Sequence, residues 1–194
     1  MIPPSKKFFS GRVPALAAWL LVLFWVGPIS TRADDSLLGK KAPDWAGVTW
    51  INSDPLPLKS LAGKVVLVRW WTAPGCPFCS ATAPALNEFY REYQGRGLEV
   101  IGFYHHKSGG PVDLEAVKRH ARRFGFQFPL AVDPGWRTLK QWWLNTGDER
   151  WTSVSFLIDR HGIVRHIHPG GQYVKGDQDY AIMKSKIEEL LEEK

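Results

Sequence analysis

The chain has 194 residues, 44% of them hydrophobic, and a formal net charge of +6. This length and apolar fraction are sufficient for one globular domain with a full hydrophobic core. Four of the 25 basic residues lie within residues 1–33, which contain no acid, so the rest of the chain is nearly neutral. No basic cluster with interleaved aromatic residues stands out, which argues against nucleic acid as a partner.

Residues 1–33 have the three parts of a secretory signal peptide. Lys6, Lys7 and Arg12 form a basic start, and an uncharged, mostly apolar run follows over 13–26. A membrane-spanning helix needs about 20 apolar residues, so this run of 14 is short for one. We therefore expect a signal peptide, with an uncleaved N-terminal anchor as the alternative.

This N-terminus also determines the expected domain organisation and location. We expect residues 34–41 to be a polar linker and residues 42–194 to form a single domain. In either case the domain is expected in the periplasm or another extracytoplasmic compartment, where thiols meet oxidising conditions. A membrane contact is expected only through an uncleaved N-terminal segment.

The first strong strand is expected at residues 65–71, which are almost continuously apolar, as in a central strand covered on both faces. After it, apolar residues recur at helical spacing over 83–93. Further strands are expected at 98–104, 129–132, 154–158 and 163–167, and further helices at 113–124, 136–144 and 177–191.

The alternation of strands and helices predicts an α/β fold with a central mixed sheet flanked by helices. The last two strands are joined by the turn residues 159–162 and form a C-terminal antiparallel hairpin. The helix at 177–191 then closes the domain.

Cys76 and Cys79 are the only cysteines, and they lie between the first strong strand and the helix that follows it. At the start of a helix, Cys76 faces unpaired backbone N–H groups and the positive end of the helix dipole, which stabilise the reactive thiolate. Pro77 suits the first helical position, because its missing N–H breaks no hydrogen bond there. Cys79, one turn later, is placed to resolve a mixed disulfide formed by Cys76.

Two other interpretations of this pair are weaker. A structural disulfide closed over two residues constrains the unfolded chain little and adds little stability. A zinc site needs four ligands, and the chain has no second CxxC or CxxH motif. The spacing and context therefore favour a redox site.

The sequence resembles the redoxin (AhpC/TSA) branch of the thioredoxin-like superfamily, in particular extracytoplasmic thiol–disulfide oxidoreductases of the TlpA/ResA type. The motifs that carry this resemblance are 42–44 (Ala-Pro-Asp), 61–68 (Leu-Ala-Gly-Lys-Val-Val-Leu-Val), Trp70-Trp71, Cys76-Pro77-Phe78-Cys79, Pro84, 98–102, 124–129 and 156–162. The resemblance covers residues 40–193. It implies a thioredoxin-like fold, with Cys76 as the nucleophile and Cys79 as the resolving cysteine. In such proteins the proline at the position of Pro84 kinks the active-site helix.

The chain departs from this family pattern in two places. The family usually has a Trp directly before the first cysteine, whereas here Ala73-Pro74-Gly75 intervenes and Trp71 lies one residue further away than expected. The family also has a cis-proline where this chain has Ser153, at a position that shapes the substrate groove. We therefore expect five residues to shape the active site, namely Trp71, Pro77, Phe78, Pro84 and Ser153.

Two histidine pairs are further candidates. His105 and His106 follow a strand that should neighbour the active-site strand, so one of them could relay protons, although a solvated loop pair is favoured. His166 and His168 share one face of the hairpin and could bind copper or zinc, but an exposed polar face is favoured.

The sequence indicates neither a bound cofactor nor a resident metal. Glu88 and Glu99 are candidates for a buried acid that tunes the thiol pKa, but their spacing selects neither of them. The predicted function is therefore an extracytoplasmic thiol–disulfide oxidoreductase that reduces protein disulfides, with oxidation as the other chemically allowed direction. Its expected partners are disulfide-containing or thiol protein substrates and an electron-donor thiol protein.

Two alternatives remain open. In a redoxin-type peroxidase Cys76 would attack peroxide and form a sulfenic acid. Peroxiredoxins place a Thr three residues before that cysteine, where this chain has Ala73, and an Arg where it has Ser153. A copper carrier would use Cys76, Cys79 and a histidine, but such carriers usually separate the cysteines by three residues.

Overall fold

The computed structural model describes residues 37–146 and 151–193, so the expected signal segment lies outside the described residues. The described strands are β1 (Thr49–Trp50), β2 (Val65–Trp71), β3 (Leu98–Tyr104), β4 (Leu130–Val132), β5 (Ser155–Ile158) and β6 (Val164–His168). The α-helices are α1 (Pro77–Tyr93), α2 (Leu114–Phe124), α3 (Arg137–Leu139) and α4 (Gln178–Glu192). None of the helices in these ranges is long and apolar enough to cross a membrane.

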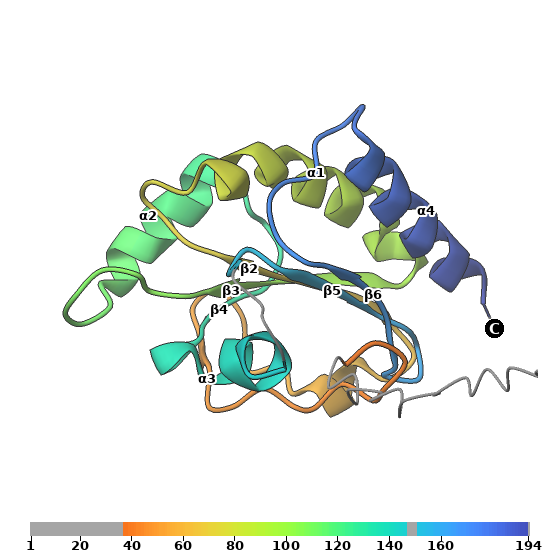
Figure 1. The fold of residues 1–194 in the computed structure, drawn as a ribbon, viewed down its shortest axis with the longest axis horizontal. Coiled ribbons are helices and arrows are strands. Elements are labelled where there is room, and N and C mark those ends of the chain that lie inside the picture. Colours follow the sequence, from red (N-terminus) through yellow and green to blue (C-terminus); the bar gives the residue numbers. More distant parts are fainter. Residues whose placement is uncertain (1–36, 147–150, 194) are drawn as a thin grey trace, which may run out of the picture. The chain divides into compact units, whose positions relative to one another are not determined.

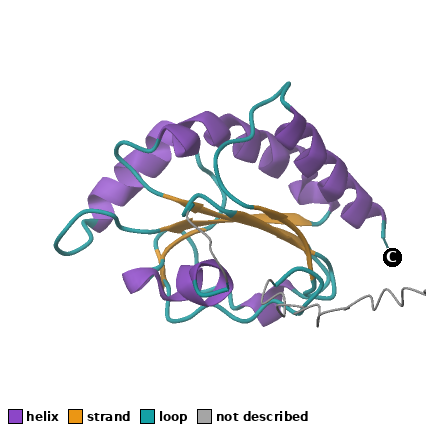
Figure 2. Ribbon diagram, viewed as in Figure 1, coloured by secondary structure: helices purple, strands orange, loops and turns teal. Residues whose placement is uncertain are grey.

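The six strands form one mixed sheet in the order β1-β4-β3-β2-β5-β6. β2, β3 and β4 are parallel, while β1, β5 and β6 each pair antiparallel with their neighbours. As Figure 1 and Figure 2 show, α1, α2 and α4 cover one face of the sheet and α3 lies on the other. This arrangement is the predicted α/β fold with a C-terminal hairpin and a closing helix.

β2 is the centre of the sheet, and all seven of its residues are buried. Successive side chains of a strand point to opposite faces, and β2 follows this rule with two separate rows. Val65, Leu67 and Trp71 belong to the core under α1 and α4, whereas Val66, Val68 and Trp70 belong to the core on the α3 side. Arg69 lies between Leu67 and Trp71 in the first row, so a charged residue faces the core beneath α1.

Side chains fix where the longer helices begin. Cys76 caps α1, Asp113 caps α2 and Asp177 caps α4, and each side chain accepts a backbone N–H three residues later. α1 begins at Pro77, where the cysteine motif predicted the helix start, although the helical spacing of apolar residues was clear only from residue 83, and the helix contains Pro84.

The segment expected as one helix at 136–144 is divided into three pieces. A 3₁₀ turn at Pro134–Trp136, α3 and a π-helical turn at Lys140–Leu144 follow one another. Gly135 and Trp136 both have positive φ, which separates the first turn from α3. β1 and the 3₁₀ turn at Leu58–Leu61 were not expected, because elements of two to four residues carry no clear periodicity.

Candidate redox site

Cys76 and Cys79 form a disulfide at the junction between β2 and α1, with their Cα atoms 5.3 Å apart. The two sulfurs differ in environment, because Cys76 is half-buried while Cys79 is only 2% exposed. The Cys76 sulfur accepts a hydrogen bond from the backbone N–H of Cys79 at 3.2 Å. One cysteine is therefore open to a partner and held at a helix N-terminus, while the other is sequestered behind it.

Two hollows meet at Cys76. The first, which we call the Ser153 hollow, has a volume of about 330 Å³, and its walls include Cys76, Phe78, Lys107, Trp151, Thr152 and Ser153. The second, the α2 hollow, has a volume of about 430 Å³ and is lined by residues that include Cys76, Ser80, His120, Arg123 and Phe124. Neither hollow is lined by a described carboxylate. A partner can thus approach Cys76 from two sides, and both sides carry basic residues.

The segment between Trp71 and Cys76 forms the rim shared by the two hollows. Pro74, Gly75 and Pro77 line both of them. The peptide bond between Ala73 and Pro74 is the only cis bond among residues 37–146 and 151–193. Because Ala73, Pro74 and Gly75 line both hollows, this segment is part of the surface around Cys76.

Ser153 lies in the wall of the Ser153 hollow and is 5% exposed. Its Oγ accepts the backbone N–H of Gly171 at 3.2 Å and lies 3.5 Å from the carbonyl oxygen of the same residue. Ser153 therefore ties this wall to the loop that leads into α4.

Phe78 and Trp151 form an apolar part of the same wall. Their ring centroids are 5.3 Å apart in an edge-to-face arrangement, and Trp151 is 54% exposed. Large exposed aromatic surface next to a reactive sulfur suits contact with a partner chain.

Two of the expected shaping residues lie away from the hollows. Trp71 is 1% exposed and packs edge-on against Tyr104 and Phe126 in the core. Pro84 lies on the exposed side of α1, within the helix. Any effect of Trp71 or Pro84 on the site is therefore indirect, through packing or helix shape.

The favoured interpretation of His105 and His106 as a solvated loop pair is wrong for His105, because His105 is fully buried. Its Nε2 lies 2.9 Å from Thr152 Oγ1, and its ring packs edge-on against Trp136. Burial, followed by the charge of Lys107, lowers the pKa of His105 to about 3. A histidine that stays neutral under ordinary conditions does not favour the proton-relay role.

The favoured interpretation of His166 and His168 as an exposed polar face is likewise wrong for His168, because His168 is only 5% exposed. Its Nε2 lies 3.4 Å from Asp179 Oδ2, and its ring packs edge-on against Tyr173. Within the described part of the chain, no three His, Cys, Asp or Glu side chains gather into a possible metal site.

The two glutamates considered as buried acids do not belong to the site. Glu99 pairs in register with Val66 and forms an ion pair with Lys64, at the end of β2 away from Cys76. Glu88 forms an ion pair with Lys175 and accepts a hydrogen bond from the Tyr180 hydroxyl, and it lines neither hollow.

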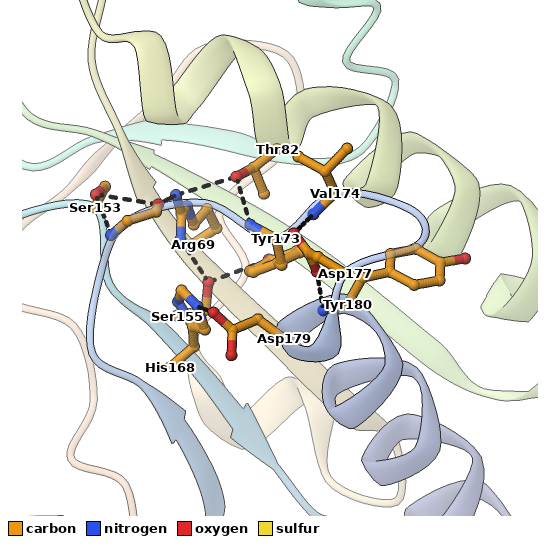
Figure 3. Close-up of polar contacts among 11 residues, drawn as sticks. Arg69, Thr82, Ser153, Ser155, His168, Tyr173, Val174, Asp177, Asp179 and Tyr180 are labelled. Carbon is orange, nitrogen blue, oxygen red and sulfur yellow. Dashed lines mark hydrogen bonds and ion pairs between the residues drawn. The ribbon is translucent and has the colours of Figure 1, made fainter.

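The charged group that does lie under α1 is Arg69, which is 0% exposed and was not recognised from the sequence (Figure 3). Its Nη2 donates to the carbonyl of Gly171 at 2.7 Å, and its Nη1 donates to Ser155 Oγ at 3.2 Å. The available signal was a single charge within the otherwise apolar run 65–71.

Comparison with known proteins is consistent with this geometry. The model of the AhpC/TSA family matches residues 38–167, which is most of the chain. The chain belongs to the AhpC/TSA family.

Named relatives in other organisms agree with this membership. The chain is 30% identical to the thiol-disulfide oxidoreductase ResA of Bacillus thuringiensis subsp. konkukian, over 83% of this chain and 80% of that protein. It is 34% identical to the protein DipZ of Mycobacterium bovis over 77% of this chain, but it spans only 20% of that longer protein. The solved thiol-disulfide isomerase of Corynebacterium glutamicum is 29% identical, with a TM-score of 0.62 over 79% of this chain and 98% of that one.

These similarities confirm the predicted thioredoxin-like fold and the redoxin branch. Together with the disulfide between Cys76 and Cys79, they also confirm the predicted class, a thiol–disulfide oxidoreductase.

Proposed function

We propose that this protein acts outside the cytoplasm and reduces disulfides in other proteins, with Cys76 as the nucleophile and Cys79 as the resolving cysteine. The observation that carries the proposal is the asymmetry of the pair, in which the half-buried Cys76 caps α1 and the other sulfur is buried. The similarity to the thiol-disulfide oxidoreductase ResA supports exchange between a dithiol and a disulfide, and the reducing direction is part of the proposal.

The chemistry begins with the reduced pair. The Cys76 thiolate attacks one sulfur of a partner disulfide, a new bond forms between Cys76 and that sulfur, and the partner's other sulfur leaves with the electron pair and takes up a proton. The Cys79 thiolate then attacks the Cys76 sulfur, forms the disulfide seen in this structure, and releases the second partner sulfur. The pair loses two electrons and the partner disulfide gains them.

The surroundings of Cys76 indicate what kind of partner is accepted. Phe78 and Trp151 offer apolar surface on one side, and the basic Lys107 and Arg123 line the two hollows. A protein segment that spans the two hollows places its disulfide at Cys76. An electron-donor thiol protein would use the same approach to reduce the pair again.

The location outside the cytoplasm rests on residues 1–33, with their basic start and short apolar run. Expression of the full chain in a bacterial host, followed by fractionation and mass measurement of the mature N-terminus, tests this part. A cytoplasmic product with an intact N-terminus would contradict it.

The activity is tested by following the reduction of insulin disulfides by dithiothreitol with the purified protein. We expect catalysis by the wild type, its loss in Cys76→Ser, and an accumulated mixed disulfide in Cys79→Ser. Full activity of Cys76→Ser would refute the proposal. Peroxide consumption that survives Cys79→Ser but not Cys76→Ser would indicate the peroxidase alternative, and stoichiometric copper binding would indicate the carrier.

A further inference from the structure

Arg69 places a charge in the core beneath the active-site helix. Its side chain is fully buried, and its three hydrogen-bond acceptors are the carbonyl of Gly171 at 2.7 Å, Ser155 Oγ at 3.2 Å and Thr82 Oγ1 at 3.5 Å (Figure 3). All three acceptors are neutral. The Nε of the guanidinium is buried and has no hydrogen-bond partner.

No carboxylate of the described chain neutralises this charge, because none forms an ion pair with Arg69. The ring of Tyr173 lies 5.3 Å from the guanidinium carbon, and burial raises the pKa of Tyr173, which keeps the phenol neutral. Burial and the charge of Arg69 both lower the pKa of His168, so this neighbour also stays neutral. Asp179 contacts His168 rather than Arg69, and its side chain is 57% exposed.

Such an arrangement is unfavourable for folding on its own. A buried charge without an oppositely charged partner carries a large desolvation penalty. That penalty lowers the pKa of Arg69, but an arginine side chain remains protonated in proteins. A hydrophobic residue would fit the pattern of the row formed by Val65, Leu67 and Trp71. The charge therefore calls for an explanation other than stability.

Two connections lead from Arg69 to the cysteines. Thr82, which contacts Arg69 Nη2, follows Cys79 by three residues on α1, so the two side chains share one buried face of the helix. On the other side, the Gly171 carbonyl that accepts from Arg69 belongs to the residue held by Ser153, which lines the same hollow as Cys76. The guanidinium thus contacts Thr82, which lies one helical turn after Cys79, and is linked through Gly171 and Ser153 to the wall of the hollow that contains Cys76.

We propose that Arg69 is a positioning residue of the dithiol, whose buried and unneutralised charge favours the thiolate of Cys79. This inference rests on the proposed function. Burial alone favours the protonated thiol, and a nearby positive charge opposes that effect. Cys79 can then attack the mixed disulfide at Cys76 as a thiolate, and its proton passes to solvent rather than to a buried carboxylate base. The partner sulfur that leaves is reduced, and the Cys76–Cys79 bond re-forms.

The test titrates Cys79 alone, in a Cys76→Ser background, by following the ultraviolet absorbance of the thiolate against pH. The Cys76→Ser, Cys79→Ser protein supplies the blank. Arg69→Met removes the charge, Arg69→Lys keeps it, and Tyr173→Phe removes a hydroxyl from the same network without changing any charge. We expect Arg69→Met to raise the midpoint of thiolate formation by about one pH unit, a tenfold loss of thiolate at a pH below the midpoint. Arg69→Lys and Tyr173→Phe should shift it far less.

An unchanged midpoint in Arg69→Met, or equal shifts in Arg69→Met and Arg69→Lys, would overturn the inference and leave Arg69 a purely structural role. If Arg69→Met does not fold, the midpoint of Cys79 thiolate formation in the Cys76→Ser protein with Arg69 intact tests the inference. A midpoint at or below the ordinary thiol value of about 8.5 supports the inference, and a clearly higher midpoint overturns it. Failure of wild-type insulin reduction would instead count against the proposed function, since the titration does not depend on any partner.

Discussion

The Cys76 sulfur lies 3.2 Å from the backbone nitrogen of Cys79, whose N–H it accepts, so the more exposed cysteine is also the N-cap of the active-site helix. This contact therefore affects both the stability of α1 and the reactivity of the Cys76 sulfur. The same N–H groups that need an acceptor at the start of α1 also stabilise a negative sulfur.

The first prediction concerns the thiolate of Cys76. In a Cys79→Ser protein, we expect the pH midpoint for alkylation of Cys76 by iodoacetamide to lie below the ordinary value of about 8.5, because of the helix N-terminus. The rate measured across pH gives this midpoint directly. A midpoint at or above the ordinary value would show that the cap does not activate the thiol.

The same contact predicts a difference between two small substitutions at Cys76. Serine is a good N-cap and alanine is a poor one, so under reducing conditions Cys76→Ala should be less stable than Cys76→Ser by about 1 kcal/mol. Urea unfolding in the presence of dithiothreitol measures this difference. Equal midpoints of unfolding would mean that the cap contributes nothing to α1.

Ser153 leads to a prediction about the wall of the Ser153 hollow. Ser153→Ala removes the acceptor for the Gly171 N–H in a buried place, so we expect a loss of about 1 kcal/mol in the free energy of unfolding. Ser108→Ala is a matched control, because Ser108 lines the same hollow but is exposed. If both variants lose the same stability, the contact with Gly171 has no special role.

Asp133 organises the side of the sheet away from the cysteines. Its two carboxylate oxygens accept from the backbone N–H of Thr138 at 3.0 Å, from that of Leu139 at 2.8 Å and from Trp70 Nε1 at 3.1 Å. We expect Asp133→Ala to lower the free energy of unfolding by about 3 kcal/mol, since buried hydrogen bonds to a charged group are lost. The thiolate midpoint of Cys76 should not change, and a shift in it would show that this face is coupled to the redox site.

Much of this architecture was predictable from local pattern. β3 has the expected bounds, 98–104, and β2 the expected bounds, 65–71, because continuous apolar runs between turns are a strong strand signal. The buried histidines were not predictable in this way. His105 is covered by Thr152 and His168 by Tyr173 and Asp179, and such contacts between distant segments leave no mark on local spacing.

The candidate site shows the same division. The position of the cysteine pair at the start of α1 followed from its flanking residues, whereas the role of Arg69 depends on its neighbours in space. Thr82, Ser155 and Gly171 come from three separate segments, and only the fold brings them to the guanidinium. A charged residue in an apolar strand indicates that a charge is buried, but the sequence does not identify the groups that bind it.

The last prediction is the effect of His105 on stability at acid pH. The pKa of His105 in the folded protein is lowered to about 3, well below its ordinary value of 6.5, mainly by burial. Between these values the unfolded chain binds a proton that the folded protein does not, so stability falls as the pH falls from 6.5 towards 3. The slope from this group alone should approach about 1.4 kcal/mol per pH unit.

His105→Gln removes this ionisation, so its free energy of unfolding should depend less steeply on pH across that window. Urea unfolding at several pH values measures the slope, and His161→Gln, at an exposed histidine, is the control. An equally steep slope in His105→Gln would mean that other groups cause the acid sensitivity. A flatter slope would show that the neutral His105 under Thr152 is a source of acid lability next to the redox site.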